Sequence, residues 1–135
     1  MLTRLPVYEI EASSEPEEAN PKQNVNDNDL STRWTSSGDG QYIILDLGNE
    51  RTIDAVGTVF HWGKERTYTF DIQVSNDKEE WKTIKEGLKN KNQIDSIEVI
   101  PFDRVNARYI RMVCHCSNVN EYNNVLEFAA LQKKN

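Results

Sequence analysis

The chain has 135 residues, and its 16 basic and 22 acidic residues give a formal net charge of −6 at pH 7. This length suits one domain with a continuous core. The acidic balance disfavours nucleic acid and anionic membranes as partners, because both repel a negatively charged protein. No apolar run approaches the roughly 18 residues that a membrane span needs. The first residues are too polar for a signal peptide, although a module cut from a longer secreted chain would also lack one.

In chain order, short β-type segments alternate with polar segments that contain Gly, Pro or Asn. Strands are expected over residues 7–14, 41–47, 52–62, 68–74, 81–86, 94–102, 107–115 and 125–131. Loops are expected over residues 15–23, 35–40, 75–80, 87–93 and 117–124. The clearest pattern is the alternation of Tyr68, Phe70, Ile72 and Val74 with polar residues, which indicates a half-buried strand. About eight short strands without an amphipathic helix predict an all-β fold, an antiparallel β-sandwich.

We interpret residues 1–135 as a single domain and leave open whether residues 1–6 belong to it or to a linker. Trp34 and Trp81 each follow a turn and start a strand, so both are predicted to lie in the core or at its rim.

The stretch from Asn24 to Trp34, N-V-N-D-N-D-L-S-T-R-W, combines two nearby carboxylates with a hydroxyl group. Asp27 and Asp29 can supply the hard oxygen ligands that Ca²⁺ prefers, and Thr32 adds a hydroxyl and a carbonyl oxygen. The helix–loop–helix calcium pattern is absent, since its glycine and glutamate do not follow at the required spacing. A solvated turn rich in Asn and Asp is the alternative interpretation.

Two cysteines, Cys114 and Cys116, flank His115 near the end of the chain. Residues two apart on a strand point to the same face, and their geometry disfavours a disulfide between them. A structural zinc site would need four Cys or His ligands, and His61 is the only other histidine. We therefore expect two reduced thiols and no zinc.

Six motifs follow one another along the chain: A-S-S (12–14), N-D-x-D-x-x-T-x-W (26–34), Y-I-I-L-D-L-G (42–48), V-S-N-D-x-x-x-W (74–81), A-R-Y-I-R (107–111) and L-E-F (126–128). In this order they resemble the discoidin-like domain, the coagulation factor 5/8 C-terminal type. The segments F-H-W-G-K-E-R-T-Y-T-F (60–70) and H-C-S-N-V-N-E-Y-N-N (115–124) are most similar to family 32 carbohydrate-binding modules, of the kind attached to bacterial alginate lyases. The resemblance implies a jelly-roll sandwich with one structural Ca²⁺ and a ligand site on loops at one end.

For the metal, the resemblance implies ligands from the acidic turn and from the last strand. The matching positions are the Asn24 carbonyl, Asp27, Asp29, Thr32 and Glu127. Asn28 stands where the family usually carries glycine, and asparagine is the residue that next best tolerates a left-handed backbone. The cation would tie the turn to the last strand, where converging carboxylates would otherwise repel one another. Cys114 and Cys116 stand where close relatives tend to carry glycine.

For the ligand, the resemblance points to the loops at 61–66 and 115–124. The candidate ligand-binding residues are His61, Trp62, Lys64, Arg66, His115, Asn118, Asn120, Tyr122 and Asn123. Arg66 is expected to bind a uronate carboxylate, because its planar fork matches carboxylate geometry. The alternatives are that Trp62 packs back onto the core, that Tyr122 plugs its loop, or that Arg66 pairs with Glu65 or Asp71.

We therefore expect a non-catalytic carbohydrate-binding module that targets a polysaccharide or its oligosaccharide products. Alginate or another uronate is preferred, and a galactose-type sugar is open. The resemblance also implies a catalytic domain, a polysaccharide lyase or a glycoside hydrolase, in the same parent chain. It implies a secreted or cell-surface location in a bacterium, and we expect a monomer.

Two other classes of function compete with this expectation. A discoidin-like domain that binds a protein or a phospholipid is disfavoured, because the loop tips other than Trp62 are charged or rich in Asn. An enzyme is disfavoured because the chain shows no nucleophile motif, phosphate loop or metal-histidine pattern.

Overall fold

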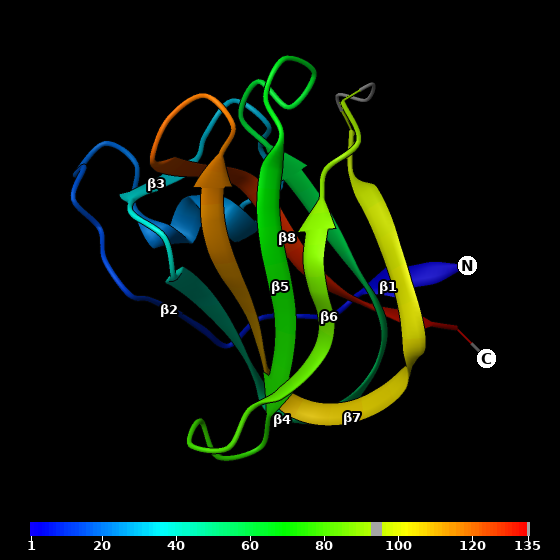
Figure 1. Ribbon diagram of the computed structural model, residues 1–135. Helices are drawn as coiled ribbons and strands as arrows, with labels where there is room; N and C mark the ends of the chain where they lie inside the picture. The colour runs from blue at the N-terminus through cyan, green and yellow to red at the C-terminus, as the bar shows by residue number, and fades with distance from the viewer. Residues whose placement is uncertain (93–95, 135) are drawn as a thin grey trace.

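The computed structural model describes residues 1–92 and 96–134 of the chain. These residues form β-strands and one short 3-10 helix (Figure 1). The elements are β1 (Leu2–Arg4), β2 (Glu9–Ala12), η1 (Lys22–Asn26), β3 (Trp34–Ser37), β4 (Gln41–Phe60), β5 (Tyr68–Ser75), β6 (Lys82–Lys89), β7 (Glu98–Ser117) and β8 (Tyr122–Lys133). Within the described part, no helix is long and apolar enough to cross a membrane.

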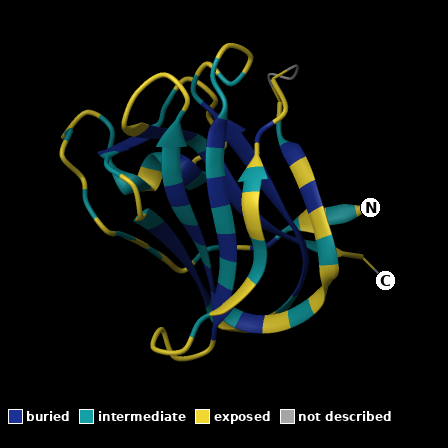
Figure 2. Cartoon of the chain, viewed as in Figure 1, coloured by how far each residue is buried: buried dark blue, intermediate teal, exposed yellow. Residues whose placement is uncertain are grey.

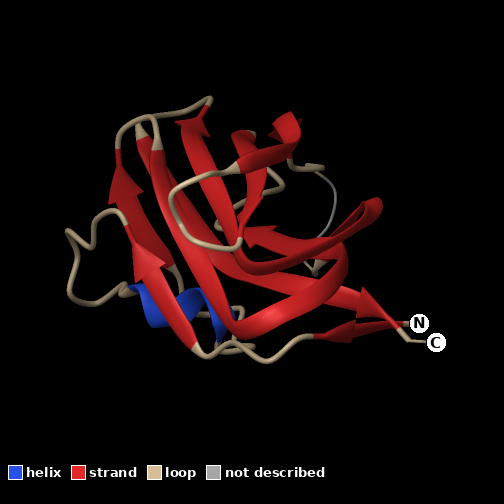
Figure 3. Cartoon of the chain, turned by 90° about the horizontal axis from the view of Figure 1, so that it is seen from below, coloured by secondary structure: helices blue, strands red, loops and turns tan. Residues whose placement is uncertain are grey.

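The two long strands, β4 and β7, run through both layers of a sandwich. Residues 41–46 of β4 pair with residues 109–114 of β7, and this pair lies between β2 and β5, with β6 beyond β5. Residues 51–58 of β4 pair with residues 98–107 of β7, and here β8 lies on the other side of β4. Strands β1 and β3 both pair with β8. All of these pairings are antiparallel, so the predicted antiparallel β-sandwich is confirmed (Figures 1 and 3).

Apolar side chains from both layers fill the space between them. Figure 2, which colours the chain by burial, shows buried residues along the strands of the sandwich. In β5 the predicted alternation is confirmed, since Tyr68, Phe70 and Ile72 are buried while the residues between them are only half-buried. Trp34 at the start of β3 is fully buried (0% exposed) and donates its ring N–H to the Ser14 carbonyl at 2.9 Å. Burial of a large ring whose polar atom is satisfied makes a rigid support for the loops above it.

Several strand boundaries differ from the predictions. The strands predicted over 41–47 and 52–62 are one strand, because irregular register between Asp46 and Arg51 lets the chain bend without leaving the ladder. The same holds for β7, which was predicted as two strands. Residues 93–95, where one of those was predicted to begin, lie outside the described residues.

Two predicted loops are wrong in part. Strand β3 (residues 34–37) begins at Trp34, where a strand start was predicted. It then continues into the segment 35–40 that its polar sequence predicted as a loop, because β8 supplies a partner for its backbone. Strand β6 continues through Gly87, which has φ of 66°, to Lys89, where a loop was predicted. Helix η1 turns the chain where a loop and a turn were predicted, and it buries Val25.

The N-terminal residues form part of the sandwich. Leu2 of β1 pairs with Lys133 of β8, and Leu5 is buried in the core. Residues 1–6, whose membership of the domain the sequence left open, therefore contribute both a strand and a core side chain.

Candidate functional site

Three loops meet at one end of the sandwich, at the top of Figure 1. They are residues 61–67 between β4 and β5, residues 118–121 between β7 and β8, and residues 27–33 before β3. The first two are joined by a pair of hydrogen bonds. The Thr67 N–H donates to the Asn118 side-chain oxygen at 2.9 Å, and the Asn118 N–H donates to the Thr67 carbonyl at 3.0 Å. The two loops that carry the candidate ligand residues therefore lie side by side.

An open groove with a volume of ≈ 610 Å³ is walled on one side by Leu30, Ser31 and Arg33 and on the other by residues 61–65. The apolar side chains of Val59, Phe60 and Leu126 also line this groove. One wall therefore comes from the β4–β5 loop, and the other belongs to the same segment as the candidate metal turn.

Trp62 is the main aromatic surface of the groove. Its side chain is 60% exposed, so it does not pack back onto the core. Its backbone is left-handed, with φ of 54°, and its carbonyl accepts the N–H groups of Glu65 and Arg66 at 3.0 and 2.9 Å. The His61 ring stacks on the indole with 4.7 Å between centroids, and the Arg66 guanidinium carbon lies 4.7 Å from the indole centroid. The tight turn thus holds the indole at the surface, in contact with two polar side chains.

The charged side chains that line the groove are two basic ones, Arg33 and Lys64, and one acidic one, Glu65. Arg33 lines it directly, and its Nε donates to the Thr35 hydroxyl at 3.2 Å. Burial lowers the pKa of His61, and the charges of Arg33 and Arg66 lower it further, so the imidazole is neutral at pH 7. Arg66 makes no ion pair with any described residue; it stacks on Trp62 and does not line the groove.

Arg33 is absent from the candidate ligand residues of the sequence. The segment around it indicated a metal turn, and that interpretation left no separate role for its one basic residue. One feature of the sequence could have indicated a binding role for Arg33, namely its position directly before Trp34. A residue next to a buried tryptophan has a fixed backbone, so its side chain starts from a defined position.

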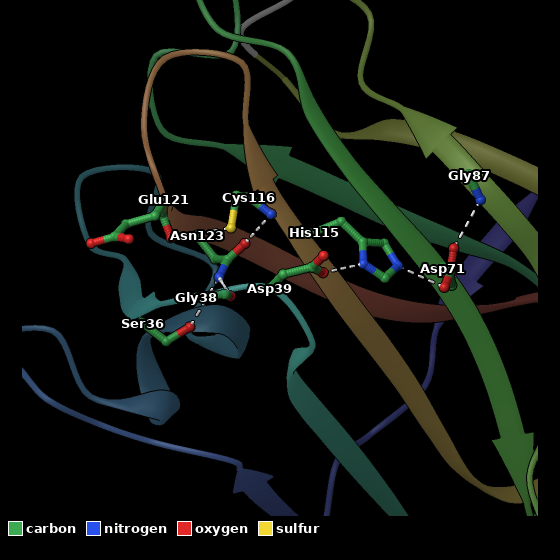
Figure 4. A network of polar contacts seen from close by, with 9 residues as sticks. All are labelled: Ser36, Gly38, Asp39, Asp71, Gly87, His115, Cys116, Glu121 and Asn123. Carbon is green, nitrogen blue, oxygen red and sulfur yellow. Dashed lines mark hydrogen bonds and ion pairs between the residues drawn. The ribbon is translucent and has the colours of Figure 1, made fainter.

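His115 does not line the groove. Its Nδ1 lies 2.5 Å from an Asp39 carboxylate oxygen and its Nε2 lies 2.8 Å from an Asp71 carboxylate oxygen (Figure 4). Burial lowers the pKa of His115, but hydrogen bonds and charge from both carboxylates outweigh it, so the pKa is raised overall. The ring clamps the β3–β4 turn to β5, and both of its nitrogens are engaged.

The Asn-rich loop uses its amides internally. Asn123 is 1% exposed; its Oδ1 accepts the Cys116 N–H at 2.7 Å, and its Nδ2 donates to the Gly38 carbonyl at 2.9 Å. The Asn120 side-chain oxygen accepts the N–H of Tyr122 at 3.0 Å, and the Tyr122 ring is partly exposed. Of the nine candidate ligand residues, those that line the groove are His61, Trp62 and Lys64.

The candidate metal turn is preformed by its own hydrogen bonds. Asn28 has φ of 59°, the left-handed conformation expected of it. The Asp27 carboxylate accepts the Asp29 N–H at 3.0 Å and the Thr32 hydroxyl at 2.6 Å. The Asp29 carboxylate accepts the hydroxyl and the N–H of Ser31 at 2.6 and 2.8 Å, and these bonds lower the pKa of Asp29.

Glu127 approaches this turn from β8 and is fully buried (0% exposed). Its Oε1 accepts a hydrogen bond from the Arg4 guanidinium at 3.0 Å, whereas its Oε2 has no partner among the described residues. Burial raises the pKa of Glu127; Arg4 opposes that rise, as does the nearby Asn28 N–H, which does not reach hydrogen-bond geometry, and the charge of Asp27 adds to it. A buried carboxylate oxygen without a partner, close to a second carboxylate, fits a ligand position for a hard cation.

The described residues contain no cluster of three or more His, Cys, Asp or Glu side chains suited to a metal ion. The turn and Glu127 therefore fit only a site that hydroxyl and carbonyl oxygens complete, which is chemistry that Ca²⁺ accepts. The Asn24 side chain donates to the Arg33 carbonyl at 2.9 Å and holds the two ends of the turn together.

Both cysteines are free thiols. Burial raises the pKa of the Cys114 thiol strongly. Burial together with Asp39 and Glu121 raises the pKa of Cys116, whose Sγ donates to the Glu121 carbonyl at 3.2 Å. Cys116 has φ of 70°, a conformation that suits glycine, which is the residue that the family resemblance led us to expect there.

Residues 9–128 match the family described as the F5/8 type C domain. The chain therefore belongs to the F5/8 type C domain family, as the ordered motifs predicted. A search among curated proteins found no match.

Among solved structures, the chain is similar to several family 32 carbohydrate-binding modules. The CBM32 of AlyQ, in complex with 4,5-unsaturated mannuronic acid, has a TM-score of 0.91 and 29% identity, with 97% of this chain and 99% of that chain covered. A truncated AlyQ with CBM32 and alginate lyase domains has a TM-score of 0.91 and 29% identity, with 98% of this chain and 34% of that chain covered. A pectin-binding carbohydrate-binding module has a TM-score of 0.89 and 29% identity, with 95% and 91% covered.

Proposed function

We propose that this chain is a non-catalytic carbohydrate-binding module whose groove takes a uronate-containing polysaccharide, such as alginate or pectin, or its oligosaccharide products. One observation carries the proposal: exposed Trp62, neutral His61 and cationic Arg33 line one open groove. A sugar ring packs its C–H face on an aromatic side chain while placed polar groups bind its hydroxyls and its carboxylate. The mannuronic acid and pectin of the two similar modules support an acidic ligand.

The openness of the groove sets the expected strength of binding. A shallow site that covers one or two sugar units should bind with Kd on the order of 10⁻⁴ M, about −5.5 kcal/mol. Binding of this strength becomes useful when the module is linked to a second binding or catalytic domain, because the link raises the effective concentration of substrate.

We further propose that the module belongs to a secreted or cell-surface bacterial polysaccharide lyase or glycoside hydrolase. The two-domain AlyQ structure supports this arrangement. The acid–base cluster of His115, Asp39 and Asp71 lies outside the groove lining, so we assign it no reaction and propose that the module acts as a monomer without catalysis of its own.

We also propose a structural Ca²⁺ at the turn before β3. The residues that would hold it are the Asn24 carbonyl, Asp27, Asp29, Thr32 and Glu127. The partnerless Oε2 of Glu127 supports this proposal. When bound, the cation supplies positive charge that offsets the converging carboxylates and links the turn to β8.

The central experiment is calorimetric titration of the purified protein with tetrasaccharides of mannuronate, guluronate, galacturonate and neutral galactose, with product release monitored. We expect saturable binding to at least one acidic tetrasaccharide and no product. Trp62→Ala should abolish binding by removing the stacking surface, while Tyr8→Ala, which removes an exposed aromatic ring elsewhere, should not. Tighter binding to the galactose tetramer would change the ligand class, and no binding to any saccharide would contradict the proposal.

A second candidate function rests on the apolar side chains at the same end of the sandwich. Leu30, Val119 and Tyr122 are exposed there together with Trp62, more apolar surface than the sequence indicated. Such a patch would favour a discoidin-like domain that binds a phospholipid surface or a protein. Co-sedimentation with phosphatidylserine–phosphatidylcholine vesicles tests this candidate, and the net charge of −6 favours a negative result.

A further inference from the structure

We propose that Arg33 is the residue by which the groove selects carboxylated sugars, binding the carboxylate through the two terminal nitrogens of its guanidinium. This inference rests on the proposed function and assigns a specificity-determining role within the same groove. It replaces the sequence-based expectation that Arg66 binds the carboxylate.

The backbone on both sides of Arg33 is fixed. The Arg33 carbonyl accepts the Asn24 side-chain amide at 2.9 Å, and Trp34, the next residue, is fully buried in the core. Strand β3 then pairs with β8, with Trp34 opposite Val125. The side chain of Arg33 therefore starts from a rigid position, although it lies on a loop.

A buried polar network also orients the guanidinium. The Arg33 Nε donates to the Thr35 hydroxyl at 3.2 Å, and that hydroxyl donates to the Asn124 side-chain oxygen at 2.8 Å. The Asn124 amide in turn lies 3.4 Å from the Tyr68 hydroxyl. Thr35, Asn124 and Tyr68 are all buried, so the anchor of Nε cannot be replaced by water without disturbing the core.

The terminal nitrogens of Arg33 are left for a ligand. Within the described residues, they form no hydrogen bond and Arg33 forms no ion pair. This is notable in a chain with 22 acidic residues, where the other groove-side segment includes Glu65. An arginine that is held at Nε presents its Nη1 and Nη2 groups as a fork, the geometry that matches the two oxygens of a carboxylate.

Arg66 lacks these features. Its guanidinium stacks on Trp62 at 4.7 Å, and its side chain does not line the groove. Its position indicates that it supports the indole. The neighbours of Arg33 complete a uronate site, because Trp62 offers a ring face and neutral His61 offers ring nitrogens for hydroxyl groups.

The test compares Arg33→Gln, Arg33→Lys and the matched control Arg66→Gln by calorimetric titration. The probes are the best-bound acidic tetrasaccharide and its carboxyl-reduced neutral form. Arg33→Gln should weaken binding of the acidic tetrasaccharide about 10-fold or more, since a charge-assisted fork is lost. It should weaken binding of the reduced form much less, because that probe has no carboxylate for the fork. Arg33→Lys should recover only part of the loss, and Arg66→Gln should weaken both probes alike. Circular dichroism melting curves establish that each variant is folded.

The outcomes distinguish failure of the proposed carbohydrate-binding function from failure of the role assigned to Arg33. If the parent protein binds no saccharide, the proposed function fails and this inference fails with it. If the parent binds the acidic tetrasaccharide and folded Arg33→Gln binds it equally well, only this inference is overturned. It is also overturned if Arg66→Gln weakens binding of the acidic tetrasaccharide but not of its reduced form, because Arg66 would then be the residue that binds the carboxylate. Selective loss in Arg33→Gln alone supports it.

Discussion

The side-chain amide of Asn123 replaces missing backbone partners where β3, β7 and β8 converge. Asn123→Ala would leave the Cys116 N–H and the Gly38 carbonyl without their partners in a partly buried place. We expect a loss of about 1–3 kcal/mol in the free energy of unfolding, measured by urea denaturation. Asn120→Ala, a change in an exposed residue of the same loop, should cost less. Equal stability of Asn123→Ala and the parent would mean that this amide is free for a ligand.

The two thiols differ in accessibility by more than their spacing suggests. Cys114 is buried with a raised pKa, and Cys116 is partly exposed. A thiol reagent such as dithionitrobenzoate should therefore modify Cys116 slowly in the folded protein and Cys114 only after unfolding. Intact-mass measurement after partial reaction, with Cys116→Ser as the control, assigns the site. A mass two units low that reductant restores would instead reveal a disulfide, which we do not expect.

At the scale of elements, the clamp of His115 between Asp39 and Asp71 predicts a dependence of stability on pH. The folded-state pKa of His115 is raised above its ordinary value of 6.5, so the folded protein holds this proton more tightly than the unfolded chain. The stabilisation is complete below about pH 6.5 and is lost as the pH rises through the raised pKa. The free energy of unfolding of the parent should therefore decrease as the pH rises above about 6.5, and His115→Gln should remove that decrease.

His61 provides an internal control, because its effect on the pH dependence of stability is opposite to that of His115. Its folded-state pKa is lowered, so the unfolded chain takes up the proton first and stability falls as the pH drops below about 6.5. His61→Gln should remove the loss of stability below about pH 6.5 and leave the loss of stability above that pH unchanged. Urea midpoints between pH 5.5 and 8.5 for the parent and both variants separate the two effects. A fall above pH 6.5 that persists in His115→Gln would rule out the clamp as its cause.

The sequence predicted elements well where one face of a strand is buried. The alternation in β5 and the motif from Tyr42 to Gly48 mark the core directly. It missed the continuation of β3 beyond Trp34, because Thr35 and Ser36 are buried by tertiary packing and pair with β8 from the far end of the chain. It also divided β4 and β7, since a bend within a strand carries the same Gly and polar residues as a turn between strands.

The site was predictable only in part for a related reason. An exposed aromatic residue in a tight turn is visible as His61–Trp62–Gly63, and the structure places that turn in the groove. The amides of the second loop looked equally polar, yet whether an Asn faces a ligand or a backbone group depends on contacts between distant segments. Arg33 was hidden because its importance comes from the anchor at Thr35 and Asn124, which no local pattern encodes.

At the scale of the whole molecule, the structure joins its two ends through Glu127. Arg4 of β1 forms an ion pair with this carboxylate, and β1 pairs with β8 along Leu2–Arg4. The turn at Asp27 lies close enough to raise the pKa of Glu127. The first strand, the loop before β3 and the last strand therefore meet at one buried carboxylate, whose charge needs compensation from more than Arg4.

The proposed Ca²⁺ supplies that compensation, and its removal gives the last prediction. A cation at 100 times its Kd stabilises the fold by about 2.7 kcal/mol, so chelation should lower the melting temperature on the order of 10 °C, and excess Ca²⁺ should restore it. Asp27→Asn and Glu127→Gln should each melt lower than the parent and no longer respond to chelator or Ca²⁺. Asp77→Asn is the matched control, because Asp77 accepts N–H groups in an exposed turn in the same way and, among the described residues, contacts neither Glu127 nor the Asp27 turn. That control should keep the full response to Ca²⁺. A parent melting curve that neither chelator nor Ca²⁺ moves, with metal analysis showing no bound calcium after purification, would mean that Arg4 alone balances Glu127.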